Sequence, residues 1–150
     1  MTRGTPRGII EPMERPFFTP ALPIILRHYP DAQAVYLFGS ALEDPEHAED
    51  VDIAILLHPA AAKRAGSFAL SDLRQELEAL FRKPVDLVNL RAVSVVFRKE
   101  IVFTGERMHT GDEFAAYEFE MLTLSLYQKL NEERREILEE FRRTGRAYEV

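Results

Sequence analysis

Hydrophobic positions along the chain follow two periods, one typical of strands and one typical of helices. Short apolar runs rich in β-branched and aromatic residues predict strands at 34–39, 50–57 and 84–90, and a brief edge strand at 106–111. Stripes at helical spacing predict helices at 20–29, 71–83, 92–105 and 112–143. Strands that alternate with helices indicate an α/β or α+β domain around a small sheet.

Local signals predict where some helices begin and what they bury. Thr19 is a candidate N-cap for the first helix, and Ser67 or Ser71 is a candidate for the second. Residues 41–49 contain four acids and are expected to form a polar surface loop. Two apolar stripes are expected to pack inside the domain, namely Leu73, Leu77, Leu80 and Phe81 in the second helix and Phe119, Leu122, Leu126 and Leu130 in the last.

The strand at 50–57 contains two aspartates in an otherwise apolar segment. Because side chains alternate along a strand, Asp50 and Asp52 are expected on the same face, with Cα atoms roughly 6–7 Å apart. Two neighbouring carboxylates repel each other, and burying them without a partner is costly. Because both side chains provide only oxygen ligands, Mg²⁺ is the cation expected for this pair.

Asp86 strengthens this interpretation because it too lies between apolar residues, Val85 and Leu87. If its strand lies beside the strand of Asp50 and Asp52, three carboxylates converge. Three converging acids can bind two metal ions, an arrangement that recurs in phosphoryl and nucleotidyl transfer. The sequence therefore predicts a two-metal site at the three aspartates.

Gly39 and Ser40 follow the first predicted strand directly. Since Gly39 has no Cβ, it lets backbone N–H groups approach a phosphate closely. A helix or tight turn that starts there would direct further N–H groups at the anion, and the Ser40 hydroxyl could add a hydrogen bond. Both residues are therefore candidates for nucleotide binding.

Each feature has a simpler explanation when it is taken alone. A Gly-Ser pair after a strand is usually a turn, and Asp86 could be an ion-paired structural acid. The seam at 119–130 is more often intramolecular core than a partner site. The four histidines show no ligand spacing and are expected to be ordinary surface or turn residues. The combination of Gly-Ser with three apolar-flanked aspartates is far more specific than any of its parts.

Charge and composition narrow the function classes. The 150-residue chain has a net charge of -6 and a pI near 5.3, which disfavours general binding to nucleic acid or to a membrane surface, although a local basic patch is compatible with it. The absence of cysteine excludes disulfides and thiolate metal sites. No apolar stretch approaches the ~20 residues of a membrane span, and no signal peptide is apparent, so a cytoplasmic location is expected. Residues 1–18 are expected to form an N-terminal arm, and residues 19–150 the domain.

The combined pattern resembles the MNT-type minimal nucleotidyltransferases of the polymerase-β-like superfamily. Their hallmark is a Gly-Ser pair, a loop, a D-x-D motif and a third aspartate on a later strand, which here correspond to Gly39, Ser40, Asp50, Asp52 and Asp86. The resemblance covers residues 20 to 130. It implies an α+β (α/β-like) fold of the polymerase-β nucleotidyltransferase type, with a small mixed sheet flanked by helices and a long C-terminal helix.

The resemblance also implies an activity, a cofactor and a partner. Many such proteins are antitoxins paired with a HEPN-domain RNase toxin, and transfer AMP from ATP to a tyrosine of that toxin. Asp50, Asp52 and Asp86 would bind Mg²⁺, with two ions expected, and Asp86 would help to activate the incoming hydroxyl. Gly39 and Ser40 would contact the ATP phosphates. A membrane or a nucleic acid is not expected as a partner, whereas a homo- or hetero-oligomer is possible.

The sequence departs from the family in the loop after Ser40. Family members often have an arginine soon after the Gly-Ser pair, but here the next residues are Ala41, Leu42 and Glu43, and the loop is one residue shorter than is common. Cationic residues elsewhere that could substitute are Arg64, Arg82 and Lys83. Two other functions therefore stay open: an antitoxin that neutralises by occlusion through its C-terminal helix, and a nucleotidyltransferase that acts on a small molecule such as an aminoglycoside.

Overall fold

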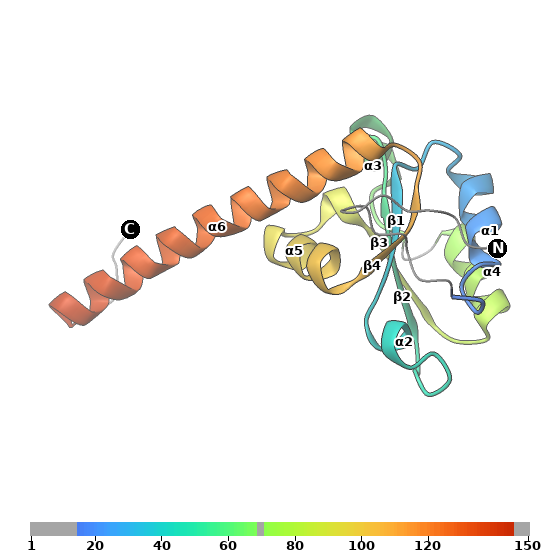
Figure 1. Cartoon of the computed structure of the whole chain (residues 1–150), viewed down its shortest axis with the longest axis horizontal. Helices are drawn as coiled ribbons and strands as arrows, with labels where there is room; N and C mark the ends of the chain where they lie inside the picture. The colour runs from blue at the N-terminus through green and yellow to red at the C-terminus, as the bar shows by residue number, and fades with distance from the viewer. Residues whose placement is uncertain (1–14, 69–70, 146–150) are drawn as a thin grey trace, which may run out of the picture.

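A computed structural model describes residues 15–68 and 71–145 of the chain. Its centre is a four-stranded sheet in the order β3-β2-β1-β4 (Figure 1). β2 pairs in parallel with β3 and antiparallel with β1, and β4 pairs antiparallel with β1, so the sheet is mixed as expected. All four expected strands are confirmed, with β4 at an edge; they are β1 (Ala34–Phe38), β2 (Val51–Leu56), β3 (Val85–Asn89) and β4 (Glu106–Thr110).

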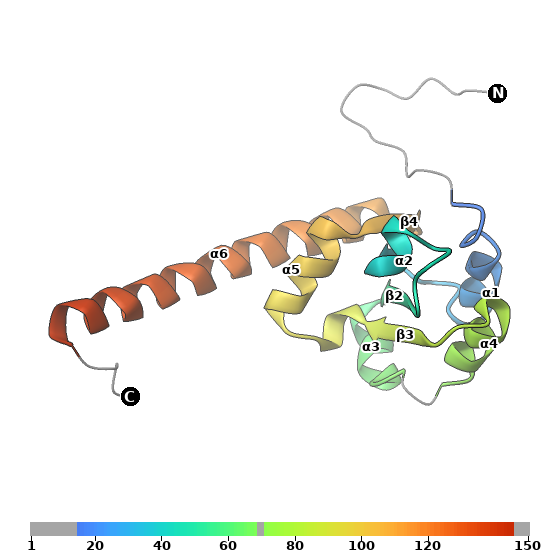
Figure 2. The same ribbon diagram turned by 90° about the horizontal axis from the view of Figure 1, so that it is seen from below.

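Helices cover both faces of this sheet (Figure 2). One face packs against α1 (Ala21–His28) and α4 (Asp72–Phe81). The opposite face packs against α5 (Val95–Thr104) and α6 (Glu113–Thr144). Three short helices follow strand ends, namely α2 (Ser40–Glu43), α3 (Pro59–Ala65) and the 3₁₀ helix η1 (Leu90–Ala92).

The alternation of side chains along β2 divides the core into two clusters, as expected. Val51, Ile53 and Ile55 are buried in the cluster that includes α1 and α4. Ala54 and Leu56 point the other way and are buried against α5 and α6. Asp52 belongs to this second face by the same alternation, at the end of the strand where helix cover stops.

Of the two N-cap predictions, one is confirmed and one is wrong. The Ser71 hydroxyl accepts a hydrogen bond from the Arg74 N–H at 3.2 Å, so Ser71 is confirmed as the N-cap of α4. The prediction for Thr19 is wrong, because Pro20 occupies the N-cap position of α1. The Thr19 hydroxyl instead donates to the Arg15 carbonyl oxygen at 3.1 Å, within the turn that precedes the helix.

The connections on either side of β2 contain helices that were not predicted. The expected loop at 41–49 is wrong in its first part, because α2 extends to Glu43 before the turns begin. α3 is alanine-rich and carries no apolar stripe, so its hydrophobic pattern gives no helical signal. Its local signals are Pro59 in the first turn and His58, whose Nδ1 accepts a hydrogen bond from the Ala60 N–H at 3.3 Å.

The expected N-terminal arm falls partly outside the described residues, which begin at Arg15. Its last four residues belong to the packed body. Phe18 is fully buried and stacks on Phe81 of α4 with ring centroids 6.3 Å apart. Arg15 forms an ion pair with Glu106 of β4 at 3.0 Å. Residues 15–18, which were expected in the arm, therefore pack against the domain.

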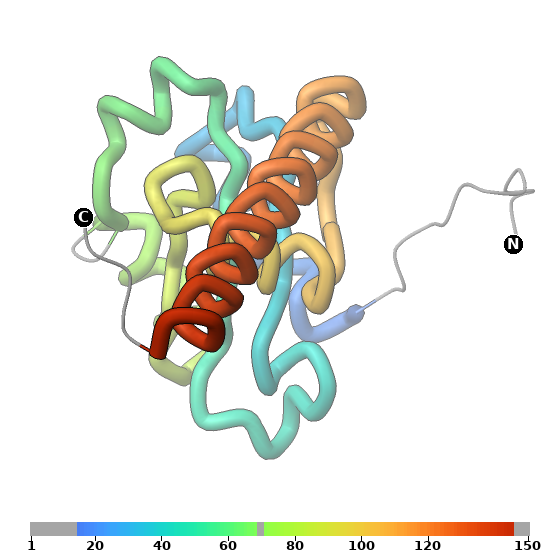
Figure 3. Tube along the Cα trace, turned by 90° about the vertical axis from the view of Figure 1, so that its left-hand side faces the viewer, coloured from blue at the N-terminus to red at the C-terminus, as the bar shows by residue number. Residues whose placement is uncertain are grey.

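α6 extends well beyond the body of the domain (Figure 1). Figure 3 looks toward the C-terminal end of this helix, which crosses in front of the body. Of its expected apolar seam, Phe119 is buried, but Leu122 and Leu126 are 53% and 36% exposed, so the prediction of an internal seam is wrong for these two. At Leu122 the reason is direction, because the neighbouring Thr123 is buried and the covered face of α6 therefore passes through Phe119 and Thr123. Further along, α5 and the sheet no longer cover the 32-residue helix. Leu80 of α4 is likewise exposed. None of the helices in the described part of the chain has both the length and the apolar character that spanning a bilayer requires.

Candidate active site

Gly39 forms the turn between β1 and α2, and the site is built around it. Its φ of +76° with ψ of -162° is a conformation that residues with a side chain rarely adopt. Phe38 pairs with Asp52 across the two strands, which places the Asp52 side chain beside the turn. A Cβ on Gly39 would lie 2.0 Å from Asp52 Oδ2, so glycine is required by both the backbone and the neighbouring carboxylate.

The three aspartates gather at one end of the β2–β3 pair. Asp52 and Asp86 are direct partners in the parallel register, so their side chains project from the same face. The sequence analysis placed Asp50 within the strand, and this is wrong, because Asp50 lies immediately before β2. It is half-buried, whereas Asp86 is exposed. The predicted adjacency of the Asp50–Asp52 strand and the Asp86 strand is therefore confirmed.

These carboxylates interact electrostatically. Burial, followed by the negative charges of Asp50 and Asp86, raises the pKa of Asp52 from its ordinary value near 3.8 to about 6. Near neutral pH the site therefore concentrates negative charge that no basic side chain in the described part of the chain compensates through an ion pair. A cation placed among the three groups would relieve this repulsion.

The donor set fits Mg²⁺ in its chemistry, since carboxylate oxygens are the ligands that this ion prefers. Residues 15–68 and 71–145 contain no group of three acidic or histidine side chains that already surrounds one point as metal ligands. Asp50 and Asp86 each reach into solvent to some degree, which leaves room for their side chains to turn. Mg²⁺ in proteins typically shares its coordination with substrate phosphate and water, so a complete protein cage is not required.

Lys83 fixes the loop that leads into the site, a role that the sequence did not reveal. Its ammonium donates to the carbonyl oxygens of Pro45 and Ala48, both at 2.7 Å. These bonds tie the start of β3 to the loop just before Asp50. Two of the three Lys83 donors are thereby engaged inside the protein. The only sequence signal for this role was the position of Lys83 just ahead of Pro84 and the predicted strand.

The other cations proposed to replace the missing family arginine have different positions. Arg64 is in α3, which follows the far end of β2, so the length of the strand separates it from Gly39 and Asp52. Arg64 therefore does not reach the phosphates at this edge, and that suggestion is wrong. Arg82 has the left-handed conformation that ends α4, with φ of 57°, and lies two residues before Pro84 at the correct end of the sheet.

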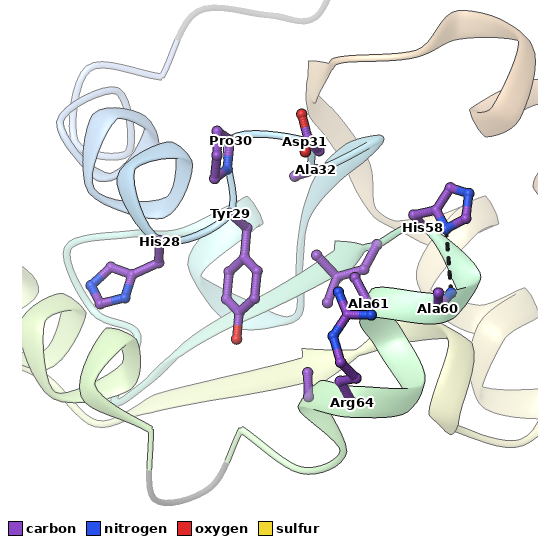
Figure 4. A pocket seen from close by; sticks show the side chains of 11 residues that line it. His28, Tyr29, Pro30, Asp31, Ala32, His58, Ala60, Ala61 and Arg64 are labelled. Carbon is purple, nitrogen blue, oxygen red and sulfur yellow. Dashed lines mark hydrogen bonds between the residues drawn. The ribbon is translucent and has the colours of Figure 1, made fainter.

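A cavity lies away from these residues. It has a volume of about 570 Å³ and lies between the turn after α1 and the start of α3 (Figure 4). Tyr29 and Pro30 form one wall, and Ala61 and Arg64 form the other. None of the aspartates contributes to its lining. The candidate active site instead lies where β1 ends and β2 and β3 begin, with Asp86 exposed there.

The match to known proteins agrees with this geometry. The family model for polymerase beta nucleotidyltransferases matches residues 22–114, which contain Gly39, Ser40 and all three aspartates. The chain belongs to this nucleotidyltransferase family. The matched segment therefore includes the candidate site at the end of β1 and the starts of β2 and β3.

The similar proteins include a protein adenylyltransferase and members of toxin–antitoxin complexes. The chain is 35% identical to the protein adenylyltransferase MntA of Shewanella oneidensis over 115 residues, covering 74% of this chain and 77% of the relative. It resembles the MNT antitoxin in a complex with the tri-AMPylated HEPN toxin of S. oneidensis, with 29% identity, a TM-score of 0.61 and 85% and 98% coverage of the two chains. A toxin–antitoxin structure with AMP-PNP matches at 31% identity and a TM-score of 0.60, covering 81% of this chain and 95% of the other.

Proposed function

We propose that this nucleotidyltransferase is an antitoxin that transfers AMP from ATP to a tyrosine of a HEPN-domain RNase toxin. The observation that carries the proposal is the meeting of Gly39, Asp52 and Asp86 at one open edge of the sheet. The named activity of the MntA relative and the AMPylated toxin bound to the MNT antitoxin support the direction of transfer. The AMP-PNP complex supports ATP as the donor.

The reaction assigns a role to each residue at the edge. The triphosphate of ATP would lie against the turn at Gly39 and Ser40, where the missing Cβ lets it approach the backbone. Asp50, Asp52 and Asp86 would hold Mg²⁺, with two ions expected, and when bound the metal would supply positive charge for the phosphates. Asp86, which is exposed on β3, would accept the proton of the attacking hydroxyl.

The transfer needs no reactant other than ATP and the tyrosine of the toxin. The tyrosine oxygen of the toxin bonds to the α-phosphorus of ATP, and the bond from that phosphorus to the bridging oxygen of the β-phosphate breaks. Pyrophosphate leaves, and the tyrosine proton passes by way of Asp86 to solvent. Most of the rate then comes from positioning and electrostatic stabilisation. ATP and Mg²⁺ are both abundant in the cytoplasm, which is where we place the reaction.

A second candidate function rests on α6. The part of this helix that extends from the body exposes Ile137, Leu138 and Phe141 by 44–54%, and its first turns expose Phe114 and Tyr117 still more. Contact between these side chains and the toxin could neutralise it by occlusion without any transfer. The absence of the family arginine after Ser40 favours this alternative, whereas the raised pKa and clustering of the three aspartates favour catalysis.

A transfer assay tests the proposal. The purified protein is incubated with Mg²⁺, ATP labelled in the α-phosphate and a purified HEPN-domain toxin, and label on the toxin is followed by gel. We expect label with the wild type and none with Asp52→Asn. Asp44→Asn, which changes an exposed acid of the neighbouring turn, is the matched control and should retain transfer. Equal labelling by wild type and Asp52→Asn would refute the mechanism.

A further inference from the structure

Three cations line a second cavity, on the α5–α6 face of the sheet. Lys63 of α3, Arg91 of η1 and Arg98 of α5 face a space of about 410 Å³, and none of its eight lining residues is acidic. Arg91 follows the far end of β3, whereas Asp86 lies at the start of that strand. The rise along a strand separates the two by roughly 10 Å or more. The cavity is therefore distinct from the candidate active site.

The two arginines bond only to neutral oxygens. Arg91 donates from Nε to the Leu57 carbonyl oxygen and from Nη2 to Gln33 Oε1 at 2.7 Å. Arg98 donates from Nε to the Val93 carbonyl oxygen at 3.0 Å and from Nη2 to the Arg91 carbonyl oxygen at 2.7 Å. A guanidinium has five N–H donors, so each arginine retains donors beyond these bonds.

The positive charge of this cluster has no direct counter-ion. In the described part of the chain, no carboxylate forms an ion pair with Lys63, Arg91 or Arg98. Burial and the charge of Arg98 lower the pKa of Arg91, an effect that the more distant carboxylate of Glu118 opposes. Burial also lowers the pKa of Arg98. Two partly buried cations thus lie close together in a chain whose net charge is -6.

Phe119 of α6 supports both guanidinium groups. The Cζ atoms of Arg91 and Arg98 lie 5.3 Å and 5.5 Å from the centre of its ring, within the range of cation–π attraction. The Phe119 side chain is itself buried, so its ring is not available to stack on a ligand. The cavity therefore offers concentrated positive charge and hydrogen-bond donors, which suit a compact anion.

We propose that this cavity binds a phosphate-class oxyanion, supplied as free phosphate, pyrophosphate or the terminal phosphates of a nucleotide. Guanidinium groups match the oxygens of phosphate in geometry, and a lysine ammonium adds a point charge. The hydrogen bonds of Arg91 and Arg98 also hold η1 to α5. That structural role does not involve Lys63, which lines the same cavity. Lys63 is exposed and makes no hydrogen bond or ion pair in the described structure, so it can be changed without disturbing the fold.

Calorimetric titration with phosphate, pyrophosphate and ATP tests this proposal. EDTA is present throughout, so that the repelling carboxylates at Asp50, Asp52 and Asp86 do not bind the same ligands through metal. We expect at least one of the three ligands to bind the wild type and to bind Lys63→Glu about tenfold more weakly, a difference of about 1.4 kcal/mol. Lys129→Glu makes the same charge change on an exposed position of α6 and should bind as the wild type does.

The three ligands distinguish the source of the anion, since the one that binds most tightly identifies it. Equal unfolding midpoints of wild type and both variants would show that the fold is intact. The proposal is overturned if none of the ligands binds in EDTA, or if Lys63→Glu and Lys129→Glu weaken binding equally. In the second case the effect would reflect net charge and not this cavity.

Discussion

The carboxylate of Asp52 occupies the space that a side chain on Gly39 would need, because a Cβ at that position would lie 2.0 Å from Asp52 Oδ2. The turn after β1 and the Asp52 end of β2 are therefore fitted to each other. The glycine permits the positive φ, and its missing side chain leaves room for the acid. A side chain at position 39 would therefore displace the carboxylate of Asp52.

Gly39→Ala should therefore impair both folding and transfer. We expect a loss of stability of roughly 1–3 kcal/mol from the backbone strain and the clash, and a fall in AMP transfer of about 100-fold as Asp52 is displaced. Gly66→Ala is the matched control, because Gly66 also has a positive φ, of 58°, but nothing lies within 4 Å of its Cβ position. Urea unfolding and the labelled transfer assay measure the two effects. Full activity of Gly39→Ala would contradict the fitted arrangement.

The raised pKa of Asp52 predicts a pH dependence of stability in the absence of divalent metal. Its folded-state pKa of about 6 lies above the unfolded value, so its favourable contribution is present below about pH 4 and is lost as pH rises through 6. Asp52→Asn should therefore be more stable than wild type at pH 7.5 by about 1 kcal/mol, after allowance for solvent screening. The difference should vanish near pH 4. Chemical denaturation in EDTA at the two pH values provides the measurement, and a constant difference would show that the acid does not titrate as described.

Mg²⁺ should offset the loss of stability that the ionised Asp52 causes. Because a ligand that binds only the folded state stabilises it, saturating Mg²⁺ is expected to raise the melting temperature of the wild type at pH 7.5. Asp52→Asn should respond much less, whereas Asp44→Asn should respond as the wild type does. Thermal unfolding with and without Mg²⁺ gives this readout independently of any transfer. An equal response of all three proteins would argue against metal binding at the aspartates.

Lys83→Met should loosen the loop that leads to Asp50. The substitution removes the two hydrogen bonds to the carbonyl oxygens of Pro45 and Ala48 but keeps much of the apolar stem. We expect a cost of about 1–3 kcal/mol and a clear fall in transfer. Lys129→Met, on the exposed surface of α6, should change neither property. If Lys83→Met is as active and as stable as the control, the loop does not depend on these bonds.

Strand alternation made much of the fold predictable. It predicted that every second side chain of the strand at 50–57 shares a face, and in the structure Ile53 and Ile55 are buried on one face of β2 and Ala54 and Leu56 on the other. It could not place Asp50, which lies just outside the strand, because strand ends depend on pairing partners that lie far away in sequence. In the same way, burial of Phe18 depends on Phe81 of α4, a contact that no local pattern encodes.

The unpredicted parts of the structure depend on hydrogen bonds and on helix geometry. α3 has no apolar stripe because it is short and mostly alanine, so only its caps identify it. Lys83 seemed free to bind phosphate, but its bonds to the loop appear only when the start of β3 is placed beside residues 45–48. The apolar seam of α6 predicted burial correctly only where α5 and the sheet cover the helix, as at Phe119.

Removing the antitoxin after the reaction tests the central claim most directly. The toxin is incubated with Mg²⁺, ATP and either wild type or Asp52→Asn, then separated from the antitoxin under conditions that dissociate the complex and allow the toxin to refold, and its ribonuclease activity is measured. Covalent transfer predicts that toxin treated with the wild type stays inactive, whereas toxin treated with Asp52→Asn regains its activity. Recovery of activity after both treatments would contradict the account and show that binding alone neutralises the toxin.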